Sequence, residues 1–216
     1  MIISILSLFP EVLKANLNYS ILGRASKNDR IEFRLVNIRD YAIDKHKSVD
    51  DRPYGGGAGM LLRVDVVEKA IAKVKSQNQR PKTKSRIVLL DPAGKVFNQA
   101  KARQYSKLDH LILICGHYEG IDARIHHFID ERISIGRYIL TGGETAALVI
   151  LESVTRLIPG VLKKEEAIIH ESFTKKNIPE CFQYTRPPEY KGYKVPKILF
   201  SGNHEAIKKW RESLVE

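Results

Sequence analysis

The sequence predicts an α/β protein: a parallel sheet with helices on both faces. Three apolar runs, at residues 87–90, 111–115 and 131–135, have the length and composition of buried strands. Each run leads into a polar loop that contains glycine, and helical patterns alternate with the runs. Such alternation is typical of parallel strands joined by helices. Because ligands usually bind beyond the carboxyl ends of such strands, the three loops form the predicted binding region.

The first half of the chain adds two predicted strands and further helices. An apolar run at 2–8 suits the first strand and lacks the basic start and cleavage site of a signal peptide. A proline in the first turn suits a helix over 10–17. Residues 19–25 suit a turn or a short helix, and residues 31–38 suit the second strand. An apolar stripe predicts an amphipathic helix over 64–75.

The second half of the chain is richer in predicted helix. Helices are expected at 98–107, 121–128 and 144–157. The last of these is apolar nearly all round, which suits a helix buried in a core or against a second subunit. A run at 195–200 has the pattern of a strand, and Asn203 is expected to cap a final helix.

The chain is expected to divide into two domains. Residues 1–160 carry the alternating strands and helices. Residues 161–174 are charged and irregular, as in an interdomain linker. Residues 175–216 are expected to form a small, mainly helical C-terminal domain.

The composition indicates a soluble protein that binds polyanions. Lysine and arginine number 36 against 25 acids, which gives a formal net charge of +11. Residues 73–107 hold much of the excess, and a field of that sign attracts nucleic acid. A solvated basic surface is the alternative. The sequence has no apolar run long enough for a membrane span. Its two cysteines, Cys115 and Cys181, have no metal-binding spacing and suit a reducing cytoplasm.

Residues 134–144, Ser-Ile-Gly-Arg-Tyr-Ile-Leu-Thr-Gly-Gly-Glu, are the most informative stretch. They join a predicted strand to a predicted helix. Glycines at such a junction allow close approach of the backbone to a ligand, and the start of the helix offers unpaired N–H groups. The stretch therefore suits a site for a small polar molecule, although a tight strand-to-helix connection would have the same pattern.

Residues 39–59 form a second unusual segment, long and almost without apolar periodicity. Loops of this length in a compact domain are usually functional or disordered. The glycines at its end are followed by no Gly-Lys-Ser/Thr, and the spacing G-x-G-x-x-G is absent. Both common phosphate-binding loops are thereby excluded.

Five motifs together resemble one family. They are Asp-Asp-Arg-Pro-Tyr-Gly-Gly-Gly-Ala-Gly-Met at 50–60, Asp-Pro-Ala-Gly at 91–94, Gly-His-Tyr-Glu-Gly-Ile-Asp at 116–122, the stretch 134–144, and Tyr-Thr-Arg-Pro at 184–187. In this order they resemble the bacterial tRNA (guanine-N1)-methyltransferases of the SPOUT class, over nearly the whole chain. The resemblance implies a trefoil knot in the C-terminal part of the sheet domain, which no periodicity in the sequence reveals and which few folds contain.

The resemblance implies a methyl donor, S-adenosyl-L-methionine, in the three loops. The implied cofactor-binding residues are Leu90, Pro92, Gly116, Ser134, Ile135, Gly136, Arg137, Tyr138, Ile139, Leu140, Gly142 and Gly143. The family usually has an acid at the position of Arg137. The resemblance also implies Mg²⁺, for which the sequence has no ligand cluster.

The resemblance further implies two catalytic residues. Glu171 stands where the family has an aspartate before Ser-Phe, and it is the expected base for the guanine N1 proton. Arg156 matches an arginine that stabilises negative charge on guanine O6. The alternatives are one acid within a charged linker and an arginine that complements a helix dipole.

The expected tRNA-binding residues are Asp50, Gly59, His117 and Glu119. The family commonly has arginine at the position of His117, and a histidine is only partly charged near neutral pH. The family also continues beyond the position of Glu216, so the C-terminal tRNA-binding domain is expected to be small.

These observations predict a cytoplasmic, homodimeric enzyme that methylates N1 of guanosine 37 in tRNA. In the family, the cofactor loops of one subunit face the linker and catalytic acid of the other. Two alternatives stay open: a related SPOUT enzyme that modifies another RNA atom, such as a ribose 2′-hydroxyl, and a catalytically idle RNA-binding relative.

Overall fold

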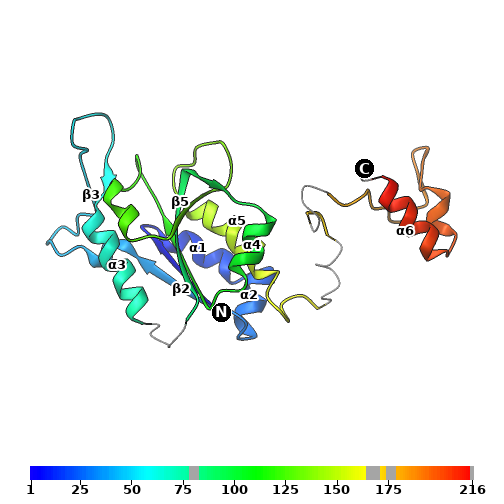
Figure 1. The fold of residues 1–216 in the computed structure, drawn as a ribbon, viewed down its shortest axis with the longest axis horizontal. Helices are drawn as coiled ribbons and strands as arrows, with labels where there is room; N and C mark the ends of the chain where they lie inside the picture. The colour runs from blue at the N-terminus through cyan, green and yellow to red at the C-terminus, as the bar shows by residue number, and fades with distance from the viewer. Residues whose placement is uncertain (78–82, 164–170, 174–178, 215–216) are drawn as a thin grey trace. The chain divides into compact units, whose positions relative to one another are not determined.

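The computed structural model describes residues 1–77, 83–163, 171–173 and 179–214 (Figure 1). The chain divides into two compact units, Met1–Lys163 and Lys164–Glu216. This division falls within the predicted linker, most of which lies outside the described residues.

The first unit contains a five-stranded parallel sheet, as the sequence predicts. Its order is β2-β1-β6-β5-β7, and each strand is parallel to its neighbours. The strands are β1 (Ile2–Ser7), β2 (Glu32–Asn37), β5 (Ser85–Val96), β6 (His110–Cys115) and β7 (Glu131–Ser134). The central strand β6 is buried throughout, which explains its uninterrupted apolar sequence.

Helices cover both faces of the sheet, so two cores flank it (Figure 1). Leu111, Leu113 and Cys115 of β6 face one core, while Ile112 and Ile114 face the other, as the two-residue period of a strand requires. The first core is covered by α1 (Pro10–Leu17), α2 (Ser20–Lys27), α4 (Gln99–Tyr105) and α5 (Glu144–Thr155). The second is covered by α3 (Val64–Ser76) and the 3-10 helices η1 (Ile38–Tyr41) and η2 (Ala123–His127).

Strand β5 is longer than predicted. The pattern indicates a strand over 87–90 and a loop at 91–94, but β5 continues to Val96 with an irregularity between Leu90 and Lys95. Both Leu90 and Lys95 pair with Ile133 of β7, so the intervening residues bulge out of the ladder. Pro92 and Gly94 obscure this strand in the sequence because both residues are rare inside strands.

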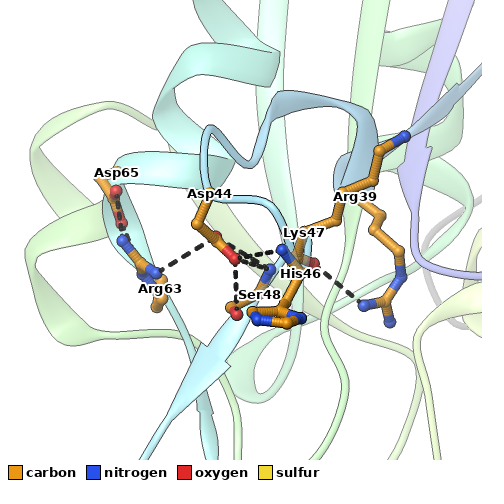
Figure 2. A network of polar contacts seen from close by, with 7 residues as sticks. All are labelled: Arg39, Asp44, His46, Lys47, Ser48, Arg63 and Asp65. Carbon is orange, nitrogen blue, oxygen red and sulfur yellow. Dashed lines mark hydrogen bonds and ion pairs between the residues drawn. The ribbon is translucent and has the colours of Figure 1, made fainter.

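The long loop after β2 is more ordered than predicted (Figure 2). The Asp44 carboxylate accepts hydrogen bonds from the backbone N–H groups of His46 and Ser48, both at 3.0 Å, and from Ser48 Oγ at 2.9 Å. These hydrogen bonds, above all the one from the Ser48 N–H, lower the pKa of the Asp44 carboxyl. Arg63 lies 4.0 Å from Asp44 and pairs with Asp65 at 2.9 Å. Side-chain hydrogen bonds therefore replace apolar packing in this loop.

The described part of the second unit contains one hairpin and two helices. The hairpin pairs β8 (Glu189–Tyr190) with β9 (Tyr193–Lys194). The predicted strand at 195–200 is wrong: Lys197–Phe200 form the 3-10 helix η4, because Pro196 precedes it with a φ of −54° that suits helix entry. Helix α6 (His204–Ser213) is confirmed, and Asn203 caps it by accepting from Ala206 N at 3.0 Å.

Candidate functional site

The bulge in β5 and the loops that follow β6 and β7 line one cavity of about 350 Å³ at the carboxyl edge of the sheet. These segments contribute residues 89–92, 116–121, 133–136 and 138–143, and Ala123, His126 and Ala146 complete the lining. This is the place where an open parallel sheet holds a ligand. The predicted convergence of the three loops is therefore confirmed.

The structure gathers most of the predicted cofactor-binding residues at this cavity. Arg137 is the exception, because it does not line the cavity although its neighbours Gly136 and Tyr138 do. The predicted residues that line it are Leu90, Pro92, Gly116, Ser134, Ile135, Gly136, Tyr138, Ile139, Leu140, Gly142 and Gly143. His117 and Glu119, predicted to contact tRNA, line the same cavity.

The glycines at 142 and 143 allow two loops to pack closely. A Cβ on Gly143 would lie 2.6 Å from the Cα of Cys115, and a Cβ on Gly142 would lie 2.2 Å from Nε2 of His117. Gly143 N also donates to Gly116 O at 2.9 Å. The glycines therefore serve contact between loops, with a φ of −79° at Gly143 that any residue adopts.

A buried carboxylate that the sequence analysis did not select stands beside these glycines. Glu144, the first residue of α5, is only 6% exposed. Its Oε1 accepts a hydrogen bond from Ser7 Oγ at 2.5 Å, and its Oε2 lies 2.9 Å from His117 Nε2. An acid in the first turn of a helix usually only complements the dipole, so the sequence offered no sign of this network.

His117 is held from several sides. Besides Glu144, the ring of Phe9 packs against it edge-on, with 5.0 Å between centroids, and Tyr118 packs at 6.1 Å. His117 also bridges Gly142 in an isolated antiparallel pair. Its side chain keeps 16% of its surface exposed at the cavity.

The loop at 50–62 reaches the same edge of the sheet. Gly59 lies against Glu119: a Cβ at position 59 would be 2.4 Å from Glu119 Cγ. Glu119 N donates to Met60 O at 3.1 Å, and Leu62 N donates to Gly120 O at 2.9 Å. Asp50 does not line the cavity. It lies in β3 (Asp50–Asp51), where it pairs with Leu62 of β4 (Leu61–Leu62). The structure thus brings Gly59 and Glu119 together.

The two predicted catalytic residues belong to different units. Arg156 ends α5 in the first unit as its C-cap. Glu171 lies in the second unit and is partly buried. Their catalytic roles therefore stay predictions.

The predicted basic segment at 73–107 is partly neutralised within the fold. Lys101 pairs with Glu131 at 2.9 Å, and Arg86 lies 3.9 Å from the same carboxylate. Glu131 also accepts from Tyr105 Oη at 3.0 Å. Burial of the phenol, followed by the charge of Glu131, raises the pKa of Tyr105.

The described residues contain no cluster of His, Cys, Asp and Glu that suits a metal ion. Among those same residues, no helix is long and apolar enough to cross a membrane. The cavity is lined by backbone groups, by apolar walls and by polar side chains that include Asp91, His117 and Glu119. Such a site suits a ligand with a flat apolar part and hydrogen-bonding edges.

Comparison with known proteins agrees with this geometry. All 216 residues match the family described as tRNA (Guanine-1)-methyltransferase TrmD. A Clostridium botulinum (strain Eklund 17B / Type B) protein named tRNA (guanine-N(1)-)-methyltransferase is 52% identical over 209 residues, which cover 97% of this chain and 85% of that protein. The protein of the same name from Latilactobacillus sakei subsp. sakei (strain 23K) is 46% identical over 212 residues, covering 98% and 85%.

A third relative of that name, from Clostridium perfringens (strain SM101 / Type A), is 49% identical over 215 residues, covering 99% of this chain and 88% of the relative. Similarity of this extent spans the cavity loops, the loop at 50–62 and the second unit. The chain therefore belongs to the tRNA (Guanine-1)-methyltransferase TrmD family.

Proposed function

We propose that this protein transfers a methyl group from S-adenosyl-L-methionine to N1 of guanosine 37 in tRNA. One observation carries the proposal: in a chain of this family, the three loops predicted to hold the methyl donor line a single cavity. The names of the relatives support the base and the atom, and the net charge of +11 supports an RNA substrate.

The cavity fits a methyl donor of this kind. Leu90, Ile135 and Leu140 offer apolar walls for an adenine ring, and the backbone of the 134–143 loop offers donors and acceptors for its edge. S-adenosyl-L-methionine, when bound, supplies an electrophilic methyl group on a positively charged sulfur. The protein then has to position the guanine, remove its N1 proton and stabilise charge on O6.

We assign proton removal to Glu171 and stabilisation of O6 to Arg156. A carboxylate suits the base role because it can accept the N1 proton directly, and a guanidinium suits a developing oxyanion because it keeps its charge. Glutamate is one methylene longer than the aspartate usual in the family. A misplacement of about 1 Å can reduce the rate roughly a hundredfold, so the backbone at Glu171 has to compensate for that length.

The guanine approaches the cavity beside the contact between the loop at 50–62 and the loop at 116–122. Gly59 and Glu119 meet there, and His117 and Glu119 line the cavity itself. We assign these three residues and Asp50 to contacts with the tRNA. Arg137 does not line the cavity, so its side chain is assigned no role in donor binding.

The remaining parts of the proposal rest on family membership. They are a SPOUT-type topology with a trefoil knot, a cytoplasmic homodimer in which each site uses the linker of the partner subunit, and dependence on Mg²⁺.

The assignment of the base is tested by Glu171→Gln, with Glu180→Gln as the matched control at an exposed position of the same unit. Methyl transfer to a tRNA transcript and binding of both substrates would be measured for each variant. The proposal predicts a loss of transfer by about a hundredfold or more in Glu171→Gln with both binding constants retained. Near-normal transfer by that variant would contradict the assignment.

A further inference from the structure

The Glu144–His117 pair has the features of a buried positioning pair. Glu144 takes part in two hydrogen bonds, one per carboxylate oxygen, and both partners come from other elements: Ser7 from the end of β1 and His117 from the loop after β6. The carboxylate sits in the first turn of α5, where the helix dipole stabilises a negative charge. Both oxygens of the Glu144 carboxylate thus have a polar partner in a nearly dry position.

This arrangement fixes which nitrogen of His117 carries hydrogen. An ionised carboxylate only accepts hydrogen bonds, so the His117 Nε2 at 2.9 Å has to donate. Ser7 Oγ fits the same pattern, because it accepts from Phe9 N at 2.8 Å and donates its own hydrogen to Glu144. In the neutral ring, Nδ1 then holds a free lone pair.

Nδ1 is also the nitrogen that remains for a ligand. Among the described residues, Nδ1 makes no hydrogen bond, and His117 lines the cavity. The rings of Phe9 and Tyr118 flank the imidazole and oppose its rotation. A lone pair on the wall of a purine-binding cavity suits an N–H donor of the purine.

We propose that Glu144 is a positioning residue that holds His117 with its hydrogen on Nε2, so that Nδ1 accepts a hydrogen bond from an N–H group of a bound purine. Two purines carry such groups here, the target guanine of the tRNA and the adenine of the methyl donor. The inference rests on the proposed function, because that function supplies both purines.

The hydrogen position is measured directly by ¹⁵N NMR of the intact protein labelled at its seven histidines. With the imidazole neutral, His117 should show a protonated Nε2 and an unprotonated Nδ1. The His117→Gln variant identifies the signals by their loss. Addition of S-adenosylhomocysteine alone, or of an anticodon stem-loop with guanosine at position 37 alone, then shows which purine moves the Nδ1 signal.

The Glu144→Gln variant tests the positioning role. Ser7 directs the amide oxygen toward itself, so the NH₂ group faces His117 Nε2 and forces the hydrogen to Nδ1. The lone pair for the purine is thereby lost, as happens when the carboxylate behind a catalytic histidine becomes an amide. We expect Nδ1 of His117 to become the protonated nitrogen and Nε2 the unprotonated one. KM for the purine that shifts the Nδ1 signal should rise by about 10- to 100-fold.

Two further variants separate positioning from structure. Glu152→Gln changes an exposed acid of the same helix and should leave the signals and both KM values unchanged. His117→Gln preserves an N–H donor for Glu144 but has no acceptor at the position of Nδ1. It should fold normally and raise the same KM as Glu144→Gln.

A wild-type His117 with hydrogen on Nδ1 would overturn the inference, as would an Nδ1 signal that neither ligand moves. Wild-type kinetics in His117→Gln would also overturn it. Failure of the proposed function looks different, because the protein would then transfer no methyl group to guanosine N1 whatever the state of His117.

Discussion

Gly59 lies directly against Glu119, with a φ of +85° that only glycine adopts readily. This contact joins the loop at 50–62 to the wall of the cavity. In Gly59→Ala, the new Cβ would strain the backbone and press on the Glu119 side chain. We expect KM for tRNA to rise at least tenfold, with unchanged affinity for S-adenosylhomocysteine. Calorimetry and steady-state kinetics measure the two quantities, and equal losses in both would contradict the assignment of this loop to tRNA.

Gly116 and Gly143 provide a matched pair at the cavity. A Cβ on Gly143 would collide with the backbone of Cys115 at 2.6 Å, whereas one on Gly116 would meet Leu90 O at an ordinary 3.7 Å. Gly143→Ala should therefore lower the free energy of unfolding by about 1–3 kcal/mol. Gly116→Ala should fold with nearly normal stability, so a loss of donor binding there would reflect contact with the ligand. Chemical denaturation separates the two effects.

Most of the sheet could be predicted from the sequence because its central strands are buried on both faces. A short, uninterrupted apolar run such as residues 111–115 is typical of a strand in the middle of a parallel sheet. The convergence of the three loops followed from the parallel topology. The bulge in β5 could not be predicted, because Pro92 and Gly94 have the pattern of a loop.

The Glu144 network was also beyond the sequence. Ser7, His117 and Glu144 lie in three distant segments, and only the fold reveals that they meet. Neither a serine at a strand end nor an acid at a helix start is unusual by itself. The order around Asp44 was missed for a related reason, because side-chain hydrogen bonds leave no periodic pattern.

His110 should make stability depend on pH. It is 1% exposed, lies 2.8 Å from Ser4 Oγ through Nε2, and has its pKa lowered from 6.5 to about 4 by burial first and then by Arg34. The unfolded chain therefore binds this proton more readily than the folded protein does. The stability from the neutral ring is complete above pH 6.5 and is lost as the pH falls toward 4, by about 3 kcal/mol at most.

Chemical denaturation at several pH values measures this effect. In His110→Gln, the free energy of unfolding should depend less on pH between 6.5 and 4. The substitution His127→Gln, at an exposed position, should leave this pH dependence unchanged. An equal slope in the wild type and His110→Gln would contradict the account.

The two thiols should differ in reactivity. Cys115 is fully buried in β6, and burial, with the nearby charge of Glu144, raises the pKa of its thiol. Cys181 is partly exposed. We expect about half of the thiols in the native protein to react quickly with Ellman's reagent, because only an accessible thiolate reacts. Cys181→Ser should not react until it is unfolded, and rapid labelling of that variant would show that β6 opens readily.

The most direct test of the central claim is the identity of the methylated nucleoside. Purified protein would be incubated with labelled S-adenosyl-L-methionine and a tRNA transcript that carries guanosine at positions 36 and 37, and the digested RNA would be analysed by mass spectrometry. The account predicts 1-methylguanosine that disappears when position 37 is changed to adenosine. Methylation of a ribose or of another base, or donor binding without any transfer, would contradict it.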